Sequence, residues 1–171
     1  MTGHNSIKMT DLASLYFNLG YTDAKTFIQS GNVIFTGNTD QTESSISATI
    51  EKEILEKFSY TVPVMIRTSR ELSSLSSVNP FLDEIKFDPA KMAVIFLHEI
   101  PSSEQIKKVK AIDYPPDKFK IIGREIFIFC PNGFGKTKLY TNFFEKKMGV
   151  IGTARNWKTI TTLRSLCGSL T

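Results

Sequence analysis

Apolar residues repeat along this chain with two different periods, and the periods distinguish helices from strands. Ile46, Ile50 and Ile54 are spaced four residues apart, which places them on one side of a helix from about 43 to 58. The run 92–97 is apolar at every position, as in a strand whose two faces are both covered. The same reasoning along the whole chain predicts two series of elements.

The first series has the order helix, strand, strand, helix, strand. We expect Thr10 to cap the first helix and Gly20 to end it in a left-handed conformation. Polar turn residues between two extended runs indicate a hairpin. The predicted elements after the first helix are strands at 25–28, 33–35 and 62–66, the helix 43–58, and a short helix at 70–78.

The second series has the order β-α-β-β-α-β, followed by one more helix that Asn156 caps. Its predicted elements are strands at 92–97, 119–122, 125–129 and 150–154, and helices at 103–111, 138–147 and 157–167. Because the first series has the same order without an opening strand, we expect an α+β fold of two tandem ferredoxin-like (alpha-beta plait) units. The expected division is 1–78 for the incomplete first unit, 79–90 for a linker, and 91–171 for the second unit.

The missing opening strand would leave backbone groups of its neighbours without ladder partners. Three explanations stay open: Met1 is an internal position of a longer natural product, another chain completes the sheet, or the strand order differs. The second explanation implies a homodimer in which a partner strand completes the first sheet.

Composition places the chain among globular proteins, with 171 residues, 41% hydrophobic and 22% charged. Cys130 and Cys167 lie in apolar segments without CxxC spacing, so neither a disulfide framework nor a thiolate metal site is favoured. No apolar run approaches the roughly 20 residues that a membrane helix needs. We therefore expect a soluble cytoplasmic protein.

Positive charge is concentrated in the last quarter of the chain. From Asn132 onward seven basic residues stand against one acidic residue, a net charge of +6, whereas the whole chain carries +4. This asymmetry favours a phosphate-bearing or otherwise acidic partner, such as a nucleotide or nucleic acid. Solvated helix faces are the alternative interpretation.

A loop rich in glycine and lysine lies between the strand 125–129 and the next predicted helix. At a helix start, free N–H groups and the helix dipole favour anions, so we identify a candidate anion site. Cys130 stands where a P-loop requires its first glycine, which argues against nucleotide hydrolysis. The alternative is a tight turn whose glycines serve only the backbone geometry. The candidate residues are Asn132, Gly133, Gly135, Lys136, Thr137 and Lys138.

Two further polar groups are candidates for ligand contacts. Arg155, Asn156, Trp157 and Lys158 combine cations with an aromatic ring that could stack on a base, although Trp157 also continues an apolar helix stripe into the core. Gln29, Ser30 and Asn32 offer amide and hydroxyl groups, although turn residues often satisfy only their own backbone. We favour core or interdomain packing over base stacking for Phe127 and Phe129, which share one strand face.

No catalytic motif is recognisable. His4 and His98 are far apart and have no metal-ligand spacing, so we expect neither a metal nor a cofactor. The leading hypothesis is a non-catalytic module that binds a phosphate-bearing ligand. The alternatives are a small-molecule enzyme with a pocket between the units, and a structural or self-associating protein. That pocket would be lined by Gln29, Asn32, Asn132 and Trp157.

Ordered motifs extend over nearly the whole chain. They include 5–9, 26–35, 79–81, 123–127, 131–139 and 153–159. Together they resemble the bacterial domain of unknown function 1697 family. The resemblance implies tandem ferredoxin-like subdomains and no established activity. Family members begin with an apolar strand and an arginine-glycine turn, and the segment matching 2–5 of this chain follows that turn. This chain lacks that opening strand.

Overall fold

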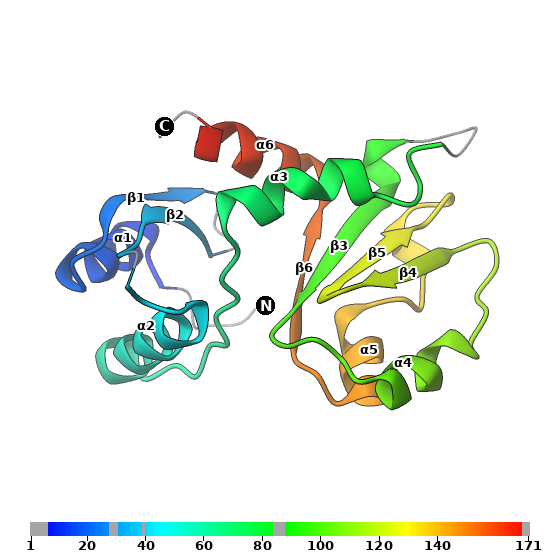
Figure 1. Cartoon of the computed structure of the whole chain (residues 1–171), viewed down its shortest axis with the longest axis horizontal. Helices are drawn as coiled ribbons and strands as arrows, with labels where there is room; N and C mark the ends of the chain where they lie inside the picture. The colour runs from blue at the N-terminus through cyan, green and yellow to red at the C-terminus, as the bar shows by residue number, and fades with distance from the viewer. Residues whose placement is uncertain (1–6, 28–30, 39, 84–87, 169–171) are drawn as a thin grey trace. The chain divides into compact units, whose positions relative to one another are not determined.

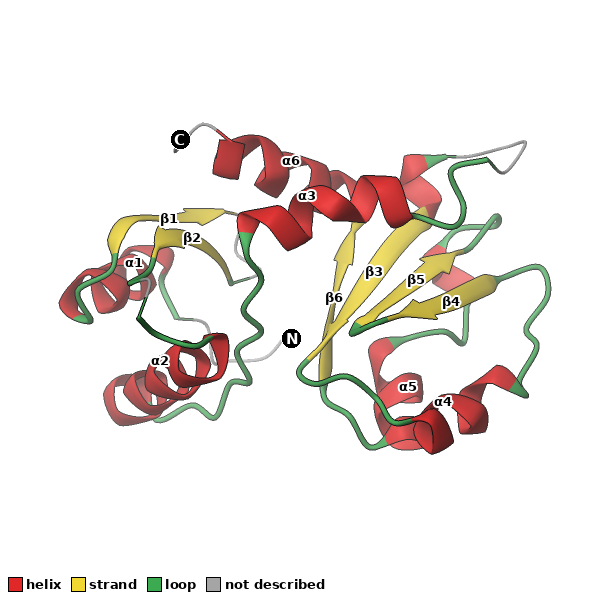
Figure 2. Ribbon diagram, viewed as in Figure 1, coloured by secondary structure: helices red, strands yellow, loops and turns green. Residues whose placement is uncertain are grey.

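The computed structural model describes residues 7–27, 31–38, 40–83 and 88–168. Within these ranges the protein is α+β, with two β-sheets and six α-helices (Figure 2). The chain divides into two compact units, and each is described by itself. Unit 1 comprises Met1–Ser69 and Leu163–Thr171, and unit 2 comprises Arg70–Thr162.

The first described element of unit 1 is helix α1 (Met9–Asn18), which buries Leu12, Leu15 and Tyr16. Gly20, with φ of 83°, ends the helix region in the left-handed conformation that the sequence predicts. The predicted cap is wrong. Lys8 is the N-cap residue, and its side chain makes no capping hydrogen bond. Thr10 lies inside the first turn, where its carbonyl accepts a hydrogen bond from the hydroxyl of Ser14.

Strands β1 (Thr22–Phe27) and β2 (Asn32–Thr36) pair antiparallel, which confirms the predicted hairpin. Helix α2 (Glu43–Phe58) has the bounds expected from its apolar period, and Ile46, Ile50 and Ile54 are buried. Thr42 caps it by accepting a hydrogen bond from the N–H of Ser45 at 3.1 Å. Both helices and the hairpin contribute to one core. Figure 1 shows these four elements in blue and cyan.

The predicted strand at 62–66 is absent, because this segment has no ladder partner among the described residues. Two side chains of α2 bond its backbone instead. The N–H of Val64 donates to Oε1 of Glu51 at 2.7 Å, and the carbonyl of Val64 accepts from the hydroxyl of Ser47 at 2.6 Å. Side-chain partners therefore occupy groups that a neighbouring strand would otherwise bond.

Unit 2 contains a four-stranded sheet in the order β4-β5-β3-β6, in which every neighbouring pair is antiparallel. Helix α3 precedes the sheet, and helix α6 follows β6 and continues past the end of the unit. The bounds are α3 (Ser69–Val78), β3 (Met92–Leu97), α4 (Ser103–Lys110), β4 (Lys118–Ile122), β5 (Glu125–Phe129), α5 (Thr141–Met148), β6 (Gly152–Asn156) and α6 (Trp157–Gly168).

This element order confirms the β-α-β-β-α-β series, but two elements are shifted. Helix α5 begins at Thr141, three residues later than predicted, and β6 begins at Gly152, two residues later. The division into units also differs from the expected one, since α3 from Arg70 onward belongs to unit 2 and Leu163–Thr171 belongs to unit 1.

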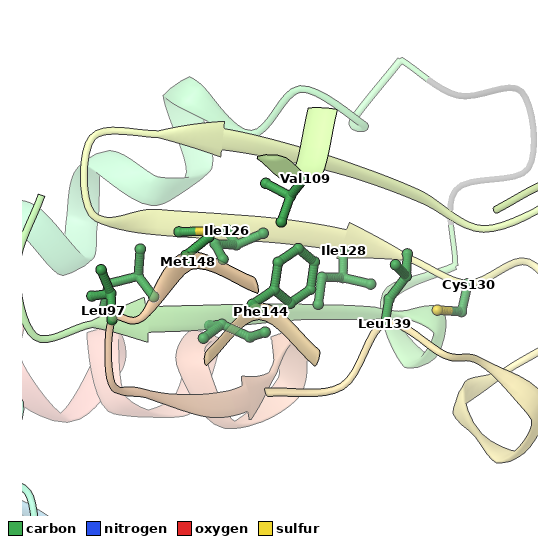
Figure 3. Packing of buried hydrophobic residues seen from close by; sticks show 10 residues of the cluster. Leu97, Val109, Ile126, Ile128, Cys130, Leu139, Phe144 and Met148 are labelled. Atoms are coloured by element: carbon green, nitrogen blue, oxygen red, sulfur yellow. The ribbon is translucent and has the colours of Figure 1, made fainter. Parts of the chain in front are cut away.

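One face of the sheet packs against α4 and α5. Leu97, Ile126 and Ile128 meet Val109 of α4 and Phe144 of α5, and all five side chains are buried (Figure 3). Figure 2 shows both helices on the same side of the strands. Contact with α4 and α5 explains why the β3 residues on this face are apolar.

The opposite face of the sheet is also buried. Phe127 is 0% exposed and Phe129 is 4% exposed. The ring of Phe81 stacks on that of Phe129 with 6.0 Å between centroids. Asn79 donates from Nδ2 to the sulfur of Met92 at 3.2 Å, so the first residues of the expected linker are part of the packed unit. Core packing of the two strand phenylalanines is therefore confirmed.

Candidate functional site

The glycine and lysine loop leaves the sheet at the end of β5. Cys130 is fully buried, and its N–H donates to the carbonyl of Lys91 at 2.9 Å. The N–H of Gly133 then donates back to the carbonyl of Cys130 at 2.8 Å, with φ of 79° at Gly133. A side chain is strained at that φ, so glycine is required here by the turn itself. The 3₁₀-helix Phe134–Lys136 follows.

This geometry contradicts the predicted helix start at the loop. Four residues, 137–140, separate the 3₁₀-helix from α5. Thr137 is buried, and its hydroxyl accepts the N–H of Leu139 at 3.1 Å. The backbone amides of Gly133 and Leu139 are thus bonded within the protein, and the first turn of α5 lies beyond the lysines. The sequence predicted that Leu139 lies on the helix. In the structure Leu139 belongs to the loop before α5, and its side chain packs in the core of unit 2.

Lys136 and Lys138 are both exposed on this loop, and so is Asn132. The hydroxyl of Tyr140 donates to the carbonyl of Phe134 at 2.6 Å, which holds the loop across the two lysines. Gly135 has open space around its Cα, because no atom lies within 4 Å of an added Cβ. The loop therefore presents two ammonium groups on a backbone that its own hydrogen bonds hold in place.

Strand order brings this loop and the second basic segment to one end of the sheet. Phe129, the last residue of β5, pairs with Met92, and Asn156, the last residue of β6, pairs with Ala93. Both strands therefore end where β3 begins, with only β3 between them, and two strand spacings amount to roughly 10 Å. We call this the Met92 end of the sheet.

The last residue of β6 and the two residues after it have distinct structural roles. Oδ1 of Asn156 accepts the N–H of Thr159 at 2.7 Å, which confirms its role as the cap of α6. Trp157 is buried, in agreement with the core interpretation. Lys158 is exposed. Of the three residues, Asn156 and Lys158 are thus exposed and Trp157 is buried.

Arg155 lies on β6, not on the helix beside Lys158. Its Nη1 donates to Oγ1 of Thr153 at 2.7 Å and to the carbonyl of Ala154 at 2.8 Å. Burial lowers the pKa of the Arg155 guanidinium. Because α6 starts at Trp157, Arg155 does not belong to the helix that carries Lys158.

The candidates in unit 1 have no exposed ligand groups in the described ranges. Gln29 and Ser30 lie outside the described residues. Asn32 is buried, and its Nδ2 donates to the carbonyl of Phe27 at 3.1 Å, which ties the two strands of the hairpin together. Two of the four residues assigned to the alternative enzyme pocket, Asn32 and Trp157, are thus buried.

One basic residue at the Met92 end was missed from the sequence. Lys118 is exposed at the start of β4, directly across from Phe129. The two-residue turn Gly123–Arg124 fixes the register of β4 and β5, so this placement could have been derived by counting back from the turn. Lys91 also lies at this end, in an ion pair with Asp88 at 3.8 Å.

Cys130 is a buried thiol beside the loop. Burial raises the pKa of its thiol, and the hydrogen bond from Thr137 opposes this, whereas nearby Asp117 adds to it. The thiol form is therefore favoured at neutral pH. In the described parts of the chain no three His, Cys, Asp or Glu side chains gather as metal ligands would.

The sequence profile of the family described as "Protein of unknown function (DUF1697)" matches residues 1–127. The chain belongs to this family. The resemblance inferred from the motifs is thus confirmed, and the matched region runs from the start of unit 1 through β4 into the first residues of β5.

A solved structure of a conserved bacterial protein from Streptococcus pneumoniae has the same fold as this DUF1697 member. The two chains are 19% identical, with a TM-score of 0.76 over 98% of this chain and 92% of the other. No match was found among curated proteins. None of the described helices is both long and apolar enough to cross a membrane.

Proposed function

We propose that this chain is a non-catalytic module that binds a phosphate-bearing ligand, a nucleotide or nucleic acid, at the Met92 end of the unit 2 sheet. Lys136, Lys138 and Lys158 would contact the ligand. Asn132 and the backbone around Gly133 and Gly135 would lie beside the ligand.

The observation that supports this proposal is the convergence of two basic segments on one end of the sheet. Lys136 and Lys138 follow β5, Lys158 follows β6, and all three are exposed. The two strands that lead into these segments end roughly 10 Å apart, which suits a ligand with several phosphates better than a single anion, since phosphates lie several ångströms apart along a strand. In this proposal the lysines alone attract the phosphates. The N-terminus of α5 does not contribute, because the helix begins at Thr141, after both loop lysines.

The test uses two probes at low ionic strength: ATP and a fluorescein-labelled single-stranded DNA. Lys136→Ala with Lys138→Ala should weaken DNA binding at least tenfold. It should also reduce the slope of log affinity against log salt by about 1.4, since each phosphate contact on a single strand contributes roughly 0.7.

Lys146→Ala with Lys147→Ala is the matched control. Both lysines are exposed in the last turn of α5, which leads toward the opposite end of the sheet, and the loss of charge is identical. The control should retain most of the binding. No binding of either probe at low salt, or equal losses in the two double variants, would overturn the proposal.

We also propose that unit 1 repeats the ferredoxin-like plan of unit 2. The elements α1, β1, β2 and α2 have the order of α4, β4, β5 and α5, and the segment 62–66 takes the place of β6. In this alignment the counterpart of β3 would lie between β2 and the segment 62–66. A structure of unit 1 in which those two segments pair directly would contradict the repeat.

A further inference from the structure

Tyr140 carries an aromatic ring that the structure leaves exposed at the start of α5. The residue is 49% exposed. Among the described residues of unit 2, the other large apolar side chains with comparable exposure are aliphatic, namely Val78, Leu82, Ile100 and Ile151. Exposed aromatic rings are the groups on which proteins stack the bases of single-stranded nucleic acids.

The ring lies at the same end of the sheet as the loop lysines. Leu139, the residue before Tyr140, belongs to the same core cluster as Cys130, and Figure 3 shows both side chains near the end of β5. Lys136 and Lys138 precede Tyr140 along the loop, and both are exposed. An aromatic surface and two ammonium groups thus occur together within five residues of the chain.

Tyr140 is held in place by its own polar end. Its hydroxyl donates to the carbonyl of Phe134 at 2.6 Å. The next residue, Gly135, adds no side chain there, although neither a positive φ nor a close neighbour requires glycine at this position. A missing side chain lets a ligand approach the backbone closely. The ring is therefore anchored next to open space, so that binding would cost little side-chain entropy.

The acidic groups of this region have partners inside unit 2. Glu145 of α5, the single acidic residue after Asn132, accepts the N–H of Gly152 at 3.0 Å. Asp117 forms a hydrogen bond with the buried thiol of Cys130. The charges exposed on the loop beside the ring are accordingly positive.

We propose that Tyr140 stacks on a base of a single-stranded nucleic acid whose phosphates contact Lys136 and Lys138. This inference rests on the function proposed above and specifies its ligand. The sequence offered Trp157 for stacking, but that residue is buried. The bases of a duplex are already stacked on one another, whereas a single strand can turn an unstacked base toward the ring.

A strand also accounts for the second basic segment. Lys158 follows β6, and the ends of β5 and β6 are separated by two strand spacings, or roughly 10 Å. A mononucleotide has one base and one short run of phosphates, so it would occupy the loop alone. A continuing strand brings further phosphates toward Lys158.

The test compares probes with and without bases. The probes are a fluorescein-labelled oligothymidylate of about eight nucleotides, an abasic oligomer of the same length, and inorganic polyphosphate. The unmodified protein should bind the oligothymidylate at least about fivefold more tightly than the abasic oligomer, which is the lower end of the measured effect of base stacking. An oligouridylate of the same length, used in a parallel series, shows whether the site prefers RNA or DNA.

Three variants separate stacking from anchoring of the loop. Tyr140→Ala should lose the preference for the oligothymidylate and bind the abasic oligomer as before. Tyr140→Phe keeps the ring without the bond to Phe134 and should retain most of the preference. Phe17→Ala is the matched control, because it removes a ring that is 55% exposed on α1, and it should leave the affinity unchanged.

The outcomes distinguish this inference from the function on which it rests. Equal binding of the oligothymidylate and the abasic oligomer by the unmodified protein, with polyphosphate also bound, would overturn the stacking role and leave phosphate binding intact. Equal losses in Tyr140→Ala and Tyr140→Phe would likewise show that the hydroxyl and not the ring is responsible. ATP bound as tightly as the oligothymidylate would exclude the strand as the ligand, and failure of every probe would overturn both proposals.

Discussion

Nη2 of Arg124 lies 2.6 Å from Oε1 of Glu71, so the turn between β4 and β5 is bonded to helix α3. The two residues are 53 positions apart in sequence. The carbonyl of Arg124 also accepts the N–H of Leu97, the last residue of β3. Arg124, in the turn between β4 and β5, thus bonds both to helix α3 and to the end of strand β3.

Arg124→Ala should lower the free energy of unfolding by about 1 kcal/mol, because it removes a charge-assisted hydrogen bond between partly buried groups. The side chains are 23% and 39% exposed, which keeps the effect below that of a buried pair. Urea denaturation of the two single variants and of the double variant with Glu71→Ala would measure the coupling.

The pair Lys52–Glu56 provides the control for this first prediction. It is an i,i+4 pair at 3.7 Å with side chains 71% and 58% exposed, and its coupling should be about 0.3 kcal/mol. Equal coupling in the two pairs would contradict the structural role of Arg124.

Gly152→Ala should destabilise the protein by about 1 to 3 kcal/mol through overpacking. An added Cβ would lie 2.8 Å from Cγ2 of Ile95 and 3.2 Å from Cδ2 of Leu97, both in the core of unit 2. Gly135→Ala is the matched substitution, since nothing lies within 4 Å and its φ is not positive. It should change stability by less than about 0.5 kcal/mol. Thermal unfolding of both variants would measure the difference in stability. A Gly152→Ala variant with unchanged stability would contradict the close packing.

Stability should fall above about pH 10 because of Tyr16. Burial raises the pKa of Tyr16, and the neighbouring Tyr21 adds to the shift. The unfolded chain releases this proton at the ordinary value while the folded chain retains it, so alkali favours the unfolded state. The contribution is fully present below the unfolded pKa and is lost as pH rises.

Tyr16→Phe isolates this effect, because the ring remains and Tyr21 still titrates in both proteins. Urea unfolding between pH 8 and pH 11 should show a shallower decline for the variant. Parallel pH profiles would mean that Tyr16 ionises equally easily in the folded chain.

Asn156→Ala should cost about 1 kcal/mol by removing the cap of α6. Asn156→Asp keeps an oxygen acceptor for the N–H of Thr159 and should restore most of the stability. Asn132→Ala, at an exposed loop position, should be nearly neutral. If the aspartate variant were as unstable as the alanine variant, the side-chain oxygen could not be the stabilising group.

Periodicity predicted those elements whose burial is decided locally. The stripe from Ile46 to Ile54 gave the bounds of α2, and the uniformly apolar run at Met92–Leu97 gave a strand covered on both faces. The cap at Asn156 was also predictable, since its side chain acts three residues away. In each case the deciding neighbours lie within a few residues in sequence.

The errors concern contacts that the local pattern does not contain. The segment 62–66 can form a strand only if another strand pairs with it, and the local sequence does not contain that information. The alternating apolar residues of the segment determine only which of its sides faces the core. Leu139 was assigned to a helix from spacing alone, although Thr137 bonds its N–H and starts a separate loop. The shared end of β5 and β6 requires the strand order, which no single segment encodes.

The outer strand β4 presents Lys118 and Lys120 to solvent at one margin of the four-stranded sheet. A strand from another molecule that paired with this edge would have to lie beside two positively charged side chains. Electrostatic repulsion there discourages fibril growth from unit 2, so the lysines protect the protein from aggregation regardless of what it binds.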